Sequence, residues 1–161
     1  MIRPSPLAIA AAALFALAAA APAAASDNAN GTLTVATEAR PARVEVAHAY
    51  LVSGPDSFDP KKMTRRIVFT RADERAAIEA CDDVGCASLS LGDGMTIDVG
   101  EAGMASWWAH VRPMQYSGMS GSALKLSADT AERMAGTFTV DTTGVKASIV
   151  FDATLVKAFA K

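Results

Sequence analysis

The residues best suited to recognising a ligand lie in the run Met104–Arg112, near the middle of the sequence. In a β-strand successive side chains point to opposite faces. One face of this run would therefore carry small and apolar residues around one large ring, at Ala105, Trp107, Ala109 and Val111. The other would present an indole, an imidazole and a guanidinium, at Trp108, His110 and Arg112. Such side chains are typical of ligand-binding surfaces, so we predict a site from these three residues and the nearby Tyr116. The alternative is that both faces are partly covered, or that Trp108 lies flat on the sheet.

A second kind of chemistry is suggested by His110, Met114 and Met119, with Met104 just before them. Thioether and imidazole ligands suit Cu(I). These positions do not form a tight repeating cluster, and the other methionines sit where core packing is an adequate explanation. We therefore expect no metal or cofactor, and keep a periplasmic copper carrier as the alternative.

Sequence motifs of known enzymes are missing from the chain. It contains no G-x-S-x-G, H-E-x-x-H, P-loop or Rossmann fingerprint. A hydrolase remains a second alternative, and it would need a pocket that joins a nucleophile to His48 or His110. The expected function is thus non-enzymatic binding of a protein partner or a small ligand.

The first 25 residues are interpreted as a cleaved signal peptide. Arg3 precedes an unbroken apolar run from Leu7 to Ala21, and small residues follow at Pro22–Ala25. That run is shorter than the ~20 residues of a membrane-spanning helix. Cleavage leaves one domain, residues 26–161, with 14 basic and 17 acidic residues and a net charge of −3. No basic stripe is visible, which disfavours nucleic acid, and no further membrane span is expected.

The two cysteines, Cys81 and Cys86, are predicted to form a disulfide, because an exported chain meets an oxidising compartment. A redox pair prefers the shorter C-x-x-C spacing. A zinc site needs two further ligands, and the only histidines are His48 and His110.

The strongest structural pattern is a β-hairpin over Met134–Phe159. Its second arm alternates apolar residues with polar ones, and Asp141–Gly144 supplies the turn. Further strands are expected at residues 32–37, 43–52, 67–70, 87–91, 95–99, 104–112, 113–121 and 122–128. In the 43–52 strand, one face would carry Val44, Val46, His48, Tyr50 and Val52, with His48 half-buried.

One short helix is expected over Arg71–Cys81, with Thr70 as its N-cap. The charged connection Phe58–Arg66 is expected to be a solvated loop. Short strands at close spacing favour an all-β fold, an antiparallel β-sandwich of about nine or ten strands.

The order of these segments resembles that of uncharacterised exported β-sandwich proteins of Gram-negative bacteria. The resemblance rests on the Ala47–Val52 strand (AHAYLV), on the following IVFTRADERAAIEA segment, and on the C-terminal G-x-F-x-V and FDATL hairpin. It implies a fold and a periplasmic or secreted location, and no activity.

Overall fold

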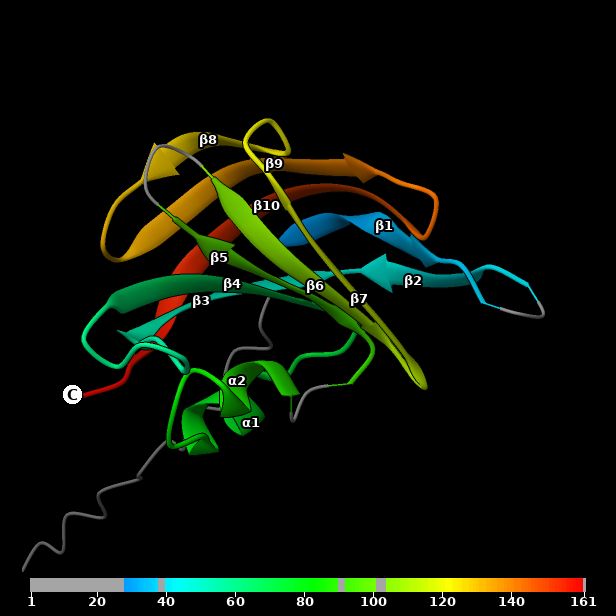
Figure 1. Ribbon diagram of the computed structural model, residues 1–161. Helices are drawn as coiled ribbons and strands as arrows, with labels where there is room; N and C mark the ends of the chain where they lie inside the picture. Colours follow the sequence, from blue (N-terminus) through cyan, green and yellow to red (C-terminus); the bar gives the residue numbers. More distant parts are fainter. Residues whose placement is uncertain (1–27, 38–39, 90–91, 101–103, 161) are drawn as a thin grey trace, which may run out of the picture.

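The computed structural model describes residues 28–37, 40–89, 92–100 and 104–160. Ten strands form one mixed sheet that curls into a half-barrel (Figure 1). The main path runs β2-β1-β10-β3-β4-β5-β6-β7, and β9 and β8 extend it from the other edge of β10. The strands are β1 (Ala29–Val35), β2 (Ala42–Val46), β3 (His48–Pro55), β4 (Met63–Thr70), β5 (Gly94–Val99), β6 (Ala105–Val111), β7 (Met114–Ser120), β8 (Leu124–Asp129), β9 (Arg133–Asp141) and β10 (Val145–Ala158).

Strand β10 organises the sheet because it is long enough to pair with three others. Along one edge it pairs with β9 from Lys146 to Thr154, which confirms the predicted hairpin. Along the other edge its first half pairs with β1, and its last residues pair in parallel with β3. The structure is therefore not the predicted sandwich of two packed antiparallel sheets. A strand shared by both halves joins them into one curled sheet, and the β10–β3 pair makes that sheet mixed.

The point where β1 gives way to β3 beside β10 is filled by Asn28. Its side-chain amide accepts a hydrogen bond from the Ala49 N–H at 2.7 Å and donates to the Ala49 carbonyl at 2.7 Å. It also donates to the Asp152 carbonyl at 3.1 Å. The Asn28 side chain thus makes the hydrogen bonds that the backbone of a strand would otherwise make between β3 and β10.

The main hydrophobic core lies inside the curl. Phe69 and Phe151 meet edge to face there, with ring centroids 5.3 Å apart. Every second residue of β6 is buried, namely Ala105, Trp107, Ala109 and Val111, as the alternation predicts. The same face of the sheet contributes Leu33, Leu51, Ile67, Ile97, Phe138 and Ile149.

A break at Ala47 divides the predicted 43–52 strand into β2 and β3. Because one residue is inserted, the faces exchange after it. Val44 and Val46 belong to the main core, whereas Tyr50 and Val52 belong to a second cluster on the outer face of the sheet. The prediction that Val44 and Val46 share one face with Tyr50 and Val52 is therefore wrong. His48 is buried, at 9% exposure, rather than half-buried.

Two short helices cover the outer face of β3 and β4 (Figure 1). Helix α1 spans Arg75–Ala80, shorter than predicted, and is preceded by Glu74 rather than capped by Thr70. Helix α2 spans Cys86–Leu89, where a strand was predicted. Neither helix in the described part of the chain is long and apolar enough to span a bilayer. We call the segment 71–89 the helical cap.

The predicted disulfide is confirmed between Cys81 and Cys86, whose Cα atoms lie 5.5 Å apart. It joins the end of α1 to the start of α2. Beneath it, Ile78, Val84 and Ala87 are buried against Tyr50 and other side chains of the outer face. Lys157 from β10 donates hydrogen bonds to the carbonyls of Glu79 and Cys81, which ties the cap to the C-terminal strand.

Tyr50 anchors the start of the helical cap. Its hydroxyl donates to Asp73 Oδ1 at 2.6 Å and accepts from the Glu74 N–H at 2.9 Å. Burial, together with the Asp73 hydrogen bond, raises the pKa of Tyr50 to about 12. The same hydrogen bond lowers the pKa of Asp73.

We expect the free energy of unfolding to fall as the pH rises from about 10 to about 12. An unfolded tyrosine ionises near pH ~10, so above that pH the unfolded chain releases a proton that the folded chain retains. Denaturant unfolding across this pH range measures the slope. Tyr50→Phe should flatten it, and Tyr116→Phe, which leaves Tyr50 in place, is the control. If the stability of Tyr50→Phe fell with pH as steeply as that of the wild type, the raised pKa of Tyr50 would not be the cause.

Candidate functional site

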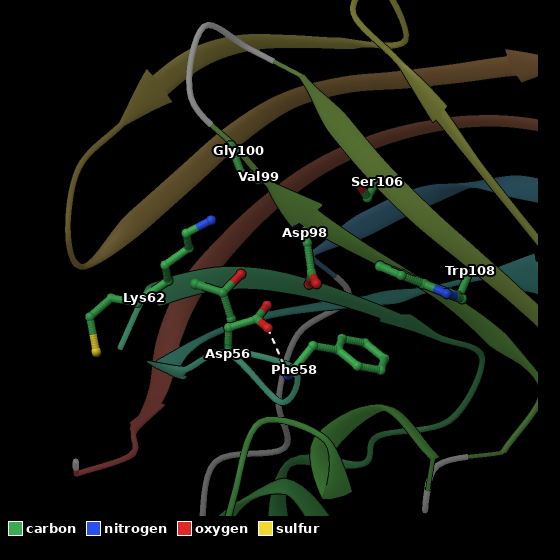
Figure 2. A pocket seen from close by; sticks show the side chains of 10 residues that line it. Asp56, Phe58, Lys62, Asp98, Val99, Gly100, Ser106 and Trp108 are labelled. Carbon is green, nitrogen blue, oxygen red and sulfur yellow. Dashed lines mark hydrogen bonds between the residues drawn. The ribbon is translucent and has the colours of Figure 1, made fainter. Parts of the chain in front are cut away.

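A groove with a volume of about 880 Å³ lies on the outer face, beside the helical cap. This volume is within the ~300–1,000 Å³ of typical ligand sites. Its walls come from the β3–β4 loop, from β4, and from β5 and β6 (Figure 2). The lining residues are Asp56, Phe58, Lys62, Met63, Thr64, Asp98, Val99, Gly100, Ser106 and Trp108.

One wall is a hydrogen-bonded turn within the exposed loop that the sequence predicts between β3 and β4. Asp56 Oδ1 accepts hydrogen bonds from the N–H groups of Phe58 at 2.8 Å and Asp59 at 2.9 Å. These bonds lower the pKa of Asp56 and keep its carboxylate charged. The turn leaves the Phe58 ring 91% exposed. Figure 2 shows that ring extending toward Trp108 from the opposite wall.

The floor of the groove contains a nearly buried ion pair. Arg66 Nε and Nη2 donate to the two carboxylate oxygens of Asp98 at 2.5 and 2.7 Å. Arg66 Nη1 donates to the Val84 carbonyl and to Ser88 Oγ, and so binds the helical cap to the sheet. The prediction of a solvated loop is therefore wrong at Arg66, which lies on the covered face of β4 and is buried.

Trp108 lies over this ion pair. Its ring centroid is 5.7 Å from the guanidinium carbon of Arg66, a cation–π contact. The indole is half-buried and also lines the groove. It therefore has two roles, packing on Arg66 and presenting an aromatic edge opposite Phe58, which combines both sequence interpretations.

His110 shares the outer face of β6 with Trp108 and is half-buried. Burial, and then the charge of Arg66, lower the pKa of His110, so the imidazole is neutral at pH 7. Within the described residues, neither His110 Nε2 nor the buried Thr96 Oγ1 has a hydrogen-bond partner. His110 lies two residues after Trp108 along β6, and it is not among the residues that line the groove.

The other two predicted site residues lie elsewhere. Arg112 is in the turn between β6 and β7, where its side chain is 83% exposed and lies 3.8 Å from Asp93. Tyr116 pairs with Ala109 and so faces the core side of the sheet, where its hydroxyl donates to the Ala36 carbonyl at 3.1 Å. The structure thus brings Trp108 and His110 together and separates Arg112 and Tyr116 from them.

The residues of the copper alternative do not converge either. Met114 pairs with Val111 and packs toward the core, whereas Met119 pairs with Ser106 on the outer face. Met119 and His110 share that face but are four residues apart in register, about 13 Å along the strands. Among the described residues, no group of three or more His, Cys, Asp or Glu side chains is arranged to hold a metal ion.

The hydrolase alternative finds no support in the groove. Its hydroxyl-bearing residues are Thr64 and Ser106, and neither His48 nor His110 is among the residues that line it. Activation of a hydroxyl nucleophile requires a base within hydrogen-bond reach. The lining residues supply only the carboxylates of Asp56 and Asp98, and Asp98 is already held by Arg66.

Sequence reasoning missed Asp56, Phe58, Arg66 and Asp98. A signal existed for the first pair, because Asp two residues before an aromatic in Pro-Asp-Ser-Phe favours a hydrogen-bonded turn that projects the ring. Arg66 has the parity of Val68 along β4, and Asp98 has the parity of Thr96 along β5. The helical cap covers the second face of these strands. The local alternation of residues does not reveal that cover.

Comparison with known proteins gives no relative from which a function can be transferred. No protein-family model matches the chain, and neither the curated proteins nor the solved structures contain a significant match.

Proposed function

We propose that this protein is an exported, non-enzymatic binding protein whose groove takes a small ligand with a flat apolar portion, held between Phe58 and Trp108. The observation that carries the proposal is the 91% exposed Phe58 ring, presented by a hydrogen-bonded turn across a groove from a second aromatic ring. The hydrogen bonds to Asp56 fix the backbone that carries the ring, so a ligand does not have to order this turn on binding.

The polar groups of the groove indicate how such a ligand would be oriented. Asp56 and Lys62 stand at its rim with opposite charges. Asp98 and Arg66 neutralise each other in the floor. The groove therefore favours a ligand without a large net charge, with an apolar body at the aromatic walls and hydrogen-bonding groups toward Thr64 and Ser106.

Export is supported by two features. The apolar run from Leu7 to Ala21, preceded by Arg3, has the pattern of a signal peptide. The Cys81–Cys86 disulfide is of a kind that persists in oxidising compartments such as the periplasm.

Phe58→Ala is expected to weaken binding of an aromatic probe, 8-anilinonaphthalene-1-sulfonate, about tenfold, which corresponds to ~1.4 kcal/mol of lost stacking and apolar contact. The melting temperature should be unchanged, because the Phe58 side chain makes little contact in the free protein. Fluorescence titration of the mature protein measures both affinities.

Val150→Ala, at a 60% exposed apolar side chain far along β10, is the matched control and should bind the probe normally. Equal affinities for wild type and Phe58→Ala, or no binding by wild type, would overturn the proposal. Native mass spectrometry of protein isolated from its own host then identifies the natural ligand by its added mass.

A further inference from the structure

Three strands of the described sheet pair with only one neighbour: β2, β7 and β8. Proteins protect such free edges with charges, bulges or short length. Strand β2 is only five residues long and carries Arg43 and Glu45. Strand β8 carries Lys125 and Asp129 and has a register shift in its pairing with β9. The seven residues of β7, MQYSGMS, contain no charge, so this edge alone lacks these protections.

A second cleft, of about 500 Å³, runs along this unprotected edge. One wall is the unbroken run Tyr116–Ser120 and the other is the run 139–142 at the end of β9. Successive residues of a strand point to opposite faces. A cleft that touches five in a row must therefore follow the strand edge, where the backbone groups lie, rather than one face of the sheet.

The opposite wall offers a second unpaired edge. Pairing between β8 and β9 begins at Leu124 and Phe138, and the Thr139 N–H donates to the Ala123 carbonyl at 2.9 Å. Beyond that point, in the described residues, Val140 and Asp141 pair only with β10. The sheet is therefore open between β7 and β9, with strand edges on both sides of the gap.

The cleft is closed at one end, which limits what can enter it. The Tyr116 ring packs so closely on Gly144 that a Cβ there would lie 2.6 Å from a ring carbon. The Tyr116 hydroxyl donates to the Ala36 carbonyl, which fixes the ring beside the turn after β9. This contact narrows the cleft at that end, where a second copy would have to bring in the edge of a whole sheet. A single extended chain needs much less width.

We propose that β7 receives an extended, uncharged peptide segment of a partner protein, which adds to the sheet as a further strand beside β7. Main-chain hydrogen bonds to β7 supply affinity in this mode of recognition. Among the residues that line the cleft only Asp141 carries a charge at neutral pH, and Lys146 pairs with it at 3.0 Å. A neutral segment therefore matches the cleft.

Two residues of β7 determine which side chains the segment can carry. Gly118 has no side chain, and a Cβ there would lie 2.5 Å from the Trp107 indole. The absence of that atom leaves the indole edge as the apolar floor of the cleft. Met119 is 70% exposed and adaptable in shape. We expect a small or medium apolar side chain to be preferred opposite Gly118.

The test is selection from a library of uncharged heptapeptides on the mature protein, followed by hydrogen exchange with the best acetylated and amidated peptide. Because a strand pairs through alternate residues, alternate amides of residues 116–120 should exchange at least ~10-fold more slowly when that peptide is bound. Ser117→Glu/Met119→Glu, at two exposed positions, should weaken the peptide at least ~10-fold by placing charges along the new strand.

Thr137→Glu, at an exposed position on β9, is the matched control and should bind the peptide normally. Phe58→Ala should also bind it normally, which separates this surface from the aromatic groove. No enrichment from the library, unchanged exchange along β7, or equal affinity for the Ser117→Glu/Met119→Glu variant would each overturn the proposal.

Discussion

Replacing Arg66 with leucine is expected to lower the free energy of unfolding by about 3–5 kcal/mol, the usual cost of removing one partner of a buried ion pair. The side chains of Arg66 and Asp98 are only 8% and 14% exposed. Without the guanidinium, Asp98 retains its charge in a covered position, and the Val84 carbonyl and Ser88 hydroxyl lose their donor. Trp108 also loses the cation beneath its ring.

Urea denaturation of the mature protein measures this change, and two further variants interpret it. Arg65→Leu removes the neighbouring arginine, whose pair with Asp129 is more exposed, and should cost less than about 1 kcal/mol. The double variant Arg66→Leu/Asp98→Leu should recover much of the loss, because both charges are then absent. If Arg66→Leu costs no more than Arg65→Leu, neither the ion pair nor the hydrogen bonds from Arg66 to the cap contribute much to stability.

Asn28→Ala is expected to lower the free energy of unfolding by about 2–3 kcal/mol, because it leaves buried backbone groups without partners. The lost bonds are those to both polar groups of Ala49 and to the Asp152 carbonyl. Ala49 is only 1% exposed, so water cannot replace them without opening the sheet. The expected damage is the separation of β3 from β10 at the branch of the sheet.

Two variants serve as matched controls for Asn28→Ala. One makes the same change at an exposed position, and the other keeps the size of the side chain but removes its hydrogen-bond donor. Asn30→Ala, two residues further along β1 and exposed, should change stability by less than ~0.5 kcal/mol. Asn28→Asp keeps the size and an acceptor but places a carboxylate against two carbonyl oxygens, so it should be at least as damaging as alanine. A smaller loss for Asn28→Asp than for Asn28→Ala would show that the donated bonds contribute little.

Local patterns predicted the elements whose two faces differ. The β9–β10 hairpin and the alternation of β6 were found from the sequence because one face of each is buried and the other is more exposed. The disulfide followed from two cysteines with few other partners. Each of these features depends on residues close together in the chain.

The features that were missed depend on residues far apart in the chain. Helix α2 was mistaken for a strand because Ala-Ser-Leu-Ser-Leu alternates, and only the disulfide and the packing of Ala87 against Tyr50 favour the helix. The single sheet depends on β10 being shared by β1, β3 and β9, which a sequence pattern does not record. The groove was missed because Phe58, Asp98 and Trp108 come from three separate segments.

The central position of β10 has a consequence for when the protein can fold. Strands β1, β3 and β9 all pair with this strand, which follows them in the sequence and is therefore synthesised after them. Contacts between distant parts of a chain also form slowly. Neither the core inside the curl nor the branch at Asn28 can be completed on a nascent chain that still lacks β10. For the export proposed above, this order is favourable, because a chain that must cross a membrane unfolded gains time before its structure closes.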